Sequence, residues 1–234
     1  MQPLFNNDLA FLNLHQISCL AGIDEAGRGC LAGPLVVAGV ELDYQNVPVG
    51  LNDSKLLSAK RREALFEQIL ITAIHYCIVE IEASVIDSIN IRQAAIQGFG
   101  QVISAMQTST DFFLIDGLDV PVEYSSISQA VVKGDSTYAC IAAASILAKV
   151  HRDRLMRGFD HIYPEYGFIR QRPLNNAPAE TVRVNSSPVY DIFSLEPSFM
   201  SKFTNYSPQK ASNLFIFSGN PENWADLSYL TIAK

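Results

Sequence analysis

The sequence lacks the features of a secreted, zinc-binding or membrane protein. Its four cysteines lie far apart, with no Cys-x-x-Cys pair and no histidines at zinc-finger spacing: Cys19, Cys30, Cys77 and Cys140. No apolar run reaches about 18 residues, and residues 1–10 lack the basic and then apolar order of a signal peptide. We therefore expect buried free thiols, a cytoplasmic location and no membrane partner.

Positive charge is also scarce. The chain has 17 Lys and Arg residues against 24 Asp and Glu residues, so its formal net charge is −7. This balance argues against a broad basic surface of the kind that binds DNA non-specifically. It leaves nucleic acid open as a partner, because bound cations can reverse the local field at an acidic groove. A monomer is the default expectation.

Apolar residues make up 48% of the 234 residues, which is enough for a substantial core. Short apolar runs predict strands at residues 17–23, 35–42, 74–81, 112–115 and 127–132. Helical spacing predicts one helix capped by Ser58, a second capped by Asn90, and a long helix through residues 145–156. This alternation indicates an α/β protein with a mixed central sheet flanked by helices.

The composition and periodicity of the sequence change after Phe168. Pro, Asn and Ser recur at short intervals, and neither a helical nor a strand period is sustained. Aromatic residues near the end of the chain predict a small irregular extension that packs back on the rest. The sequence thus predicts a main domain over residues 1–168 and a divergent, loosely folded segment over residues 169–234.

A glycine-rich turn follows two acids in GIDEAGRGCLAGP, residues 22–34. Such a turn after a strand can hold a pyrophosphate, but the dinucleotide-binding fingerprint needs a helix next. Here Pro34 and the valine-rich run after it predict a strand instead. Asp24 and Glu25 would also repel a polyanion unless a cation lay between them, so the dinucleotide hypothesis is disfavoured.

Carboxylates stand at several predicted strand ends. Asp24 and Glu25 close the first strand, Asp116 closes a later one, and Asp135 follows Gly134 just before the long helix. Acids at a strand end can simply face water, but adjacent strand ends can also bring them to one point. Mutual repulsion would then protonate some of them unless hard divalent ions such as Mg²⁺ or Mn²⁺ were bound.

Several motifs together resemble those of the ribonuclease HII family. In order, they are GIDEAGRG, LNDSKLLSAKRREALF, LIDG, VVKGDS, AAASILAKVHRDRLM and YPEYGF, and they extend from about Leu20 to Phe168. The resemblance implies a ribonuclease H-like fold over the main domain, which would then be the catalytic domain. It also implies a metal-dependent endonuclease that cleaves the RNA strand of RNA/DNA hybrids and incises 5′ of single ribonucleotides in duplex DNA, giving 5′-phosphomonoesters.

The resemblance assigns roles to individual residues. It implies that Asp24, Glu25 and Asp116 bind Mn²⁺ or Mg²⁺ and that Asp135 is a fourth catalytic acid. Two such ions could activate water and stabilise the leaving oxygen. Asp119 falls where the family has a loop, and we expect it at the surface.

The resemblance also implies a set of substrate contacts. The backbone of Gly27, Arg28 and Gly29 would recognise the ribose 2′-hydroxyl, because residues without a bulky Cβ allow close approach. Phosphate contacts would come from Lys55, Lys149 and Arg152. From spacing alone, Lys149 and Arg152 could equally form a solvated helix face with Asp153.

The sequence departs from the family after Phe168. Family members usually continue with Lys-Gly-Tyr-x-Thr, whose tyrosine stacks on a substrate sugar, whereas this chain has residues 171–176, QRPLNN. A drifted segment, a frame-shifted coding region, or replacement by another aromatic residue such as Tyr190 would each fit. A catalytically weak nucleic-acid-binding relative is therefore an alternative. A resolvase or transposase of the same fold would explain the acids but not GRG, DSK and SILAKV together.

Overall fold

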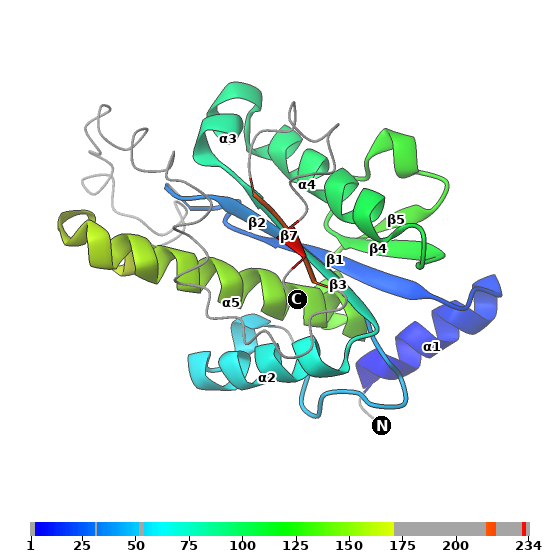
Figure 1. Cartoon of the computed structure of the whole chain (residues 1–234). Helices are drawn as coiled ribbons and strands as arrows, with labels where there is room; N and C mark the ends of the chain where they lie inside the picture. The colour runs from blue at the N-terminus through cyan, green and yellow to red at the C-terminus, as the bar shows by residue number, and fades with distance from the viewer. Residues whose placement is uncertain (1–2, 31, 52–53, 171–213, 219–230, 233–234) are drawn as a thin grey trace.

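The computed structural model describes residues 3–30, 32–51, 54–170, 214–218 and 231–232. A central sheet separates two helical layers (Figure 1). The order of its strands is β5-β4-β1-β2-β3-β6-β7, so the earliest strands lie in the middle. The α/β class, the mixed sheet and the flanking helices predicted from the sequence are confirmed.

The sheet mixes parallel and antiparallel neighbours. The strands are β1 (Leu20–Ala26), β2 (Leu35–Glu41), β3 (His75–Ile81), β4 (Phe112–Asp116) and β5 (Ser128–Val131). The strands β1, β2 and β3 form an antiparallel meander, whereas β4 pairs parallel with both β1 and β5. Because β1, β4 and β5 run in one direction, their carboxyl ends meet at one edge of the sheet. The strand β2 after the glycine turn also confirms why the dinucleotide-binding fingerprint does not apply.

Helices cover both faces of the sheet. One face carries α4 (Ile91–Met106), with α3 (Ala83–Ile89) beside it. The other carries α5 (Ala139–Ile162), α2 (Ala59–Thr72) and α1 (Pro3–His15). The predicted caps are confirmed: the Ser58 side chain accepts from the backbone N–H of Arg61, and that of Asn90 accepts from Arg92 and Gln93.

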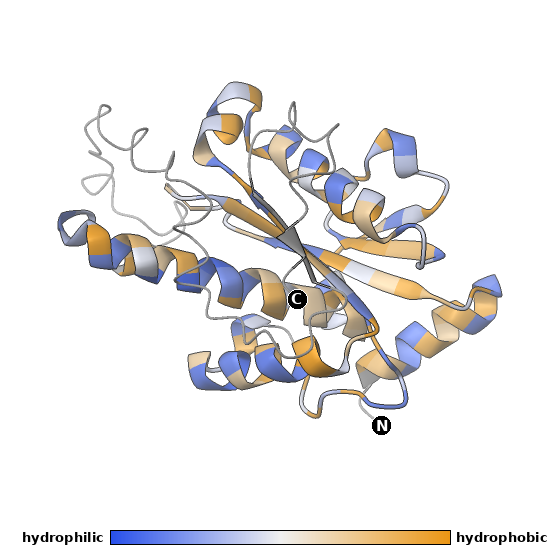
Figure 2. Ribbon diagram, viewed as in Figure 1, coloured by the Kyte–Doolittle hydropathy of each residue, from blue (hydrophilic) through white to orange (hydrophobic). Residues whose placement is uncertain are grey.

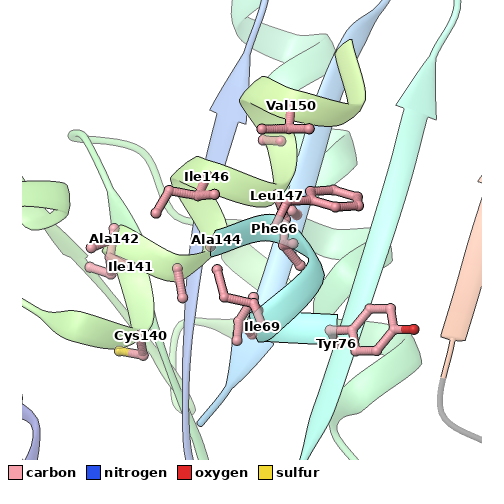
Figure 3. Close-up of a cluster of buried hydrophobic side chains, with 14 of the residues drawn as sticks. Phe66, Ile69, Tyr76, Cys140, Ile141, Ala142, Ala144, Ile146, Leu147 and Val150 are labelled. Carbon is pink, nitrogen blue, oxygen red and sulfur yellow. The ribbon is translucent and has the colours of Figure 1, made fainter. Parts of the chain in front are cut away.

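The core explains why the strands are so apolar. Strand β2 is buried along its whole length because successive side chains face opposite helical layers. Figure 2 shows this as predominantly hydrophobic colouring of the central strands and striped colouring of the helices. On the α5 face, small and branched residues of α5 meet Phe66 and Ile69 of α2 (Figure 3). The close packing of α5 on the sheet holds in place the strands that carry the site.

Helix α1 was not expected from the sequence. Its carboxylate Asp8 accepts hydrogen bonds from the backbone N–H groups of Ala139 and Cys140, both at 2.9 Å, at the start of α5. The Tyr44 hydroxyl donates to the same carboxylate at 2.9 Å. The N-terminus of α5 is therefore capped by a residue from a distant helix, which satisfies backbone donors that the helix itself cannot.

The C-terminal region is described only in part. Residues 171–213, 219–230 and 233–234, including the divergent segment 171–176 and Tyr190, lie outside the described residues. Strand β6 (Leu214–Ser218) pairs parallel with β3, and β7 (Thr231–Ile232) pairs with β6. These strands lie in the C-terminal stretch that was expected to pack back on the rest, and the division at residue 168 stays a prediction. In the described ranges, no helix is long and apolar enough to cross a membrane.

Candidate active site

The candidate site lies at the edge where three parallel strands end. Asp24 sits in β1, Asp116 is the last residue of β4, and Asp135 lies in the short 3-10 helix Gly134–Ser136 that follows β5. Carboxylate oxygens of these three residues all lie within 4.8 Å of one another. The sheet order makes β1, β4 and β5 neighbours, so it brings together acids that are 92 and 19 positions apart in the sequence.

Glu25 lies beside this cluster but outside it. Neighbouring residues of a strand point to opposite faces of the sheet, so Glu25 cannot share the direction of Asp24. Its Oε1 pairs with Nε of Arg28 at 3.1 Å. Its Oε2 is buried and has no hydrogen-bond partner among the described residues. A buried carboxylate oxygen without a partner is costly, so this atom marks a position where a cation would be stabilising.

Asp24 and Asp116 are oriented by donors close to them. The backbone N–H of Gly134 donates to Oδ1 of Asp116 at 2.7 Å. The Ser145 hydroxyl hydrogen-bonds the Asp24 carboxylate, and its Oγ lies 2.9 Å from that of Ser54. Both serines are buried, so they limit the rotation of the Asp24 side chain. Sequence reasoning missed this role of both serines, because nothing in their spacing places them beside an acid.

Burial and mutual repulsion shift the protonation of the acids. Burial raises the pKa of Asp24 well above its usual range, and the charges of Glu25 and Asp116 raise it further. Burial also raises the pKa of Glu25 to about 7, although the Arg28 guanidinium opposes that change. The pKa of Asp116 is raised by burial and by Asp135. The cluster therefore holds negative charge at a free-energy cost that bound cations would remove.

Lys55 partly compensates the charge of the cluster. Its Nζ donates to Oδ2 of Asp135 at 2.9 Å, while 75% of the side chain remains exposed. The turn that carries Lys55 is held from below by Arg62, which donates to the backbone oxygens of Ser54 and Leu57. Lys55 can thus reach both the acids and the solvent in front of them.

The glycine turn, residues 27–30 and 32–34, lies next to the acids. Gly27 has φ +119° and the N–H of Cys30 donates to its carbonyl at 3.0 Å, which closes a tight turn. A side chain at Gly27 would be strained in this conformation. Arg28, 39% exposed, reaches back to Glu25. The predicted substrate-reading segment therefore borders the predicted metal site.

The two basic residues predicted on α5 have different surroundings. Lys149 is 41% exposed and pairs with Asp153 at 2.6 Å, as the spacing allowed. Arg152 turns inward, is 5% exposed, and donates from Nε to the backbone oxygen of Pro34 at 3.0 Å. Its Nη2 donates to the backbone oxygen of Ala32 at 2.8 Å.

Asp119 does not belong to the acid cluster. Arg92, at the start of α4, donates from Nε and Nη2 to its carboxylate oxygens at 2.7 to 3.2 Å. Its side chain is only 14% exposed, so it is less open to solvent than the sequence suggested. This ion pair lowers the pKa of Asp119.

The donor set suits hard divalent ions. Each member supplies carboxylate oxygen, the ligand that Mg²⁺ and Mn²⁺ prefer, and no sulfur or imidazole lies in the cluster. Acids clustered at the carboxyl ends of adjacent parallel strands are typical of α/β proteins that bind their ligands at this edge of the sheet. The fold and the site together define this class.

Comparison with known proteins identifies the family. The family model for ribonuclease HII matches residues 21–169. The ribonuclease HII of Magnetococcus marinus is 49% identical over 158 residues, which cover 67% of this chain and 74% of that protein. The chain belongs to the ribonuclease HII family. This membership supports ribonuclease H endonuclease activity.

Solved structures agree with this assignment. The ribonuclease HII of Archaeoglobus fulgidus, solved in a complex with PCNA, is 31% identical with a TM-score of 0.57, and the match covers 64% of this chain and 80% of that one. A more distant relative, Bst-RNase HIII solved in complex with Mn²⁺, is 19% identical with a TM-score of 0.56. That match covers 73% of this chain and 62% of the other, and it supports the fold alone.

Proposed function

We propose that the chain is an endonuclease that cleaves the RNA strand of RNA/DNA hybrids and incises 5′ of single ribonucleotides in duplex DNA. It would use two Mn²⁺ or Mg²⁺ ions and leave 5′-phosphomonoesters. The observation that carries the proposal is the convergence of Asp24, Asp116 and Asp135, from three separate segments, within 4.8 Å. A structural role gains little from clustered acids, because their repulsion opposes folding.

The acids have distinct proposed roles. Asp24, Asp116 and Glu25 would hold the ions, with the unpartnered Oε2 of Glu25 as one of the donors. Asp135 would serve as the fourth catalytic acid, kept beside the others by Lys55. When bound, the ions would activate water for attack on phosphorus and stabilise the 3′-oxygen that leaves. The all-oxygen donor set of the cluster supports the choice of ion.

Substrate would be held in front of the acids. The backbone of Gly27, Arg28 and Gly29 would approach the ribose 2′-hydroxyl, which distinguishes RNA from DNA. Lys55 and Lys149, whose side chains are 75% and 41% exposed, would contact phosphates. Ion binding at Glu25 would compete with its pair to Arg28, which would free the guanidinium for substrate.

We further propose that residues 1–168 form the catalytic domain and that the protein acts as a monomer in the cytoplasm. The four cysteines are free thiols, which fits a reducing compartment. The alternative is a binding relative with weak catalysis, favoured by the changed sequence after Phe168. Such a relative would bind hybrids without needing the acids.

The test is cleavage of a hybrid whose RNA strand is labelled at its 5′ end, with Mn²⁺ or Mg²⁺ added. We expect internal cuts in the RNA strand, an intact DNA strand, and loss of cutting in Asp24→Asn. The matched control is Asp87→Asn, an exposed acid on α3, which should cut like the wild type. A folded protein that binds the hybrid and Mn²⁺ but never cuts it would favour the binding relative.

A further inference from the structure

We infer that Arg152 is a positioning residue that anchors the glycine turn and thereby sets discrimination between RNA and DNA, rather than a phosphate contact. This inference rests on the proposed function for its consequence, but the anchoring itself is a property of the protein alone. Arg152, predicted to contact substrate, is 5% exposed, and its guanidinium donates to two backbone oxygens of the turn.

Burial separates Arg152 from the other predicted phosphate contacts. Lys55 and Lys149 keep 75% and 41% of their side chains exposed, so both side chains lie at the surface that a phosphate can reach. The described residues contain no carboxylate paired with Arg152, so the oxygens of Ala32 and Pro34 compensate its charge. Hydrogen bonds from a charged donor in a buried setting are among the stronger ones.

The two acceptors are spaced for a fork. Nε and Nη2 are neighbouring donors of one planar group, and they bind oxygens two residues apart in the chain, at 3.0 and 2.8 Å. Holding both oxygens with one rigid group fixes the path of the backbone between them. A lysine has a single point of attachment and could not hold both oxygens with the same geometry.

Two glycines of the turn lie against this guanidinium. A Cβ on Gly27 would lie 2.7 Å from Nε of Arg152, and a Cβ on Gly33 would lie 3.3 Å from its Nη2 and 2.5 Å from Sδ of Met156. Both glycines have positive φ, at +119° and +93°. The absence of side chains at these positions therefore permits close contact with Arg152 below the turn, in addition to any contact with a nucleotide above it.

The helix that carries Arg152 is held firmly by the core. Arg152 belongs to α5, which packs along β1 and β2 (Figure 1). The preceding residue, His151, is fully buried and bonds Glu80 of β3, with Nε2 and Oε1 2.6 Å apart. The turn is thus tied to the rigid core, and its backbone is held where the 2′-hydroxyl would be read. Preorganised backbone of this kind supports discrimination better than a mobile loop does.

The experiment separates anchoring from phosphate contact through salt. Full-length wild type, Arg152→Gln, Arg152→Lys and Lys149→Ala are loaded with Mn²⁺ and given a duplex with one ribonucleotide, with an all-DNA duplex as competitive inhibitor. The ratio of the inhibition constant to KM measures discrimination. The slope of the logarithm of the inhibition constant against that of salt concentration counts phosphate contacts.

Anchoring predicts that Arg152→Gln lowers discrimination by about tenfold with an unchanged salt slope. Arg152→Lys should fail to restore discrimination, because it keeps the charge but loses the fork. Lys149→Ala should instead reduce the salt slope by about 0.9 and keep the discrimination ratio. A reduced slope in Arg152→Gln that Arg152→Lys restores would overturn the inference.

Two further measurements keep the inference testable in every case. If the Arg152 variants do not fold, Gly33→Ala displaces the turn while leaving the charge in place, and unchanged discrimination in this variant would overturn anchoring. If the wild type shows no discrimination or no cutting, the proposed function fails. Hydrogen exchange of the amides of residues 27–30 then decides: faster exchange in Arg152→Lys than in Lys149→Ala supports anchoring, and equal exchange overturns it.

Discussion

Repulsion within the acid cluster should lower the free energy of unfolding of the metal-free protein. One substitution can measure how large this effect is. Replacing Asp116 by asparagine removes a negative charge while keeping an oxygen that can accept from the N–H of Gly134. The size and shape of the side chain hardly change. Without metal, Asp116→Asn should therefore be more stable than the wild type, although it should be inactive.

The magnitude follows from the distances. Two full charges at the 4.8 Å limit that separates the cluster oxygens repel by about 3.5 kcal/mol at an effective dielectric constant of about 20. Asp116 has two such neighbours, Asp24 and Asp135, but Lys55 offsets part of the repulsion, and partial exposure to water screens it. The weaker hydrogen bond to a neutral acceptor subtracts more. A net gain of about 1 to 2 kcal/mol remains, which raises Tm by about 2 to 8 °C for a chain of this size.

The assay is urea and thermal unfolding in EDTA and again with saturating Mn²⁺. Asp116→Asn should unfold later than the wild type in EDTA, and the order should reverse with Mn²⁺, because the wild type binds the ions more tightly. The control is Asp119→Asn, three residues further on, which loses its pair with Arg92 and should gain no stability. If Asp116→Asn is no more stable than the wild type in EDTA, the reasoning from repulsion is refuted.

Three other outcomes follow from the structure. Gly22→Ala should destabilise the fold by about 3 kcal/mol in urea unfolding, because its Cβ would lie 2.2 Å from the backbone carbon of Cys140; normal stability would contradict the packing of α5 on β1. Ser145→Ala should weaken Mn²⁺ binding about tenfold by calorimetry with little change in Tm, because the Asp24 carboxylate loses its buried donor; unchanged affinity would refute this role. Burial raises the pKa of Asp8 to about 6, so the wild type's advantage over Asp8→Asn should be largest near pH 4. It should shrink by about 3 kcal/mol as the pH rises to 7, because between about pH 4 and pH 6 the unfolded state has released this proton while the folded state still holds it. A constant difference would argue against the shift.

Sequence reasoning reached the strands and the two capped helices because their signals are local. Short apolar runs and the caps at Ser58 and Asn90 depend only on neighbours within a few positions. Helix α1 lacked such a signal, and its Asp8 contacts residues more than 130 positions away. Contacts of that separation are set by the tertiary fold and leave no spacing pattern in the sequence.

The candidate site was predictable in part for the same reason. Acids that end or follow the predicted strands, Asp24, Asp116 and Asp135, could be read from the sequence, and adjacent strand ends offered a way to bring them together. The contact of Arg152 with the glycine turn could not be predicted from the sequence. Helix periodicity shows on which side of α5 a residue lies, but not which loop packs against that side. The pairing of Glu25 with Arg28 likewise depends on the conformation of the glycine turn.

The most direct test of the account is incision of a labelled DNA duplex that contains one ribonucleotide, with Mn²⁺ or Mg²⁺ and with Asp116→Asn alongside. We expect a single cut 5′ of the ribonucleotide by the wild type, no cut in EDTA, and none by Asp116→Asn. A folded wild-type protein that binds Mn²⁺ and leaves this duplex intact, or an Asp116→Asn variant that cuts as fast as the wild type, would contradict it.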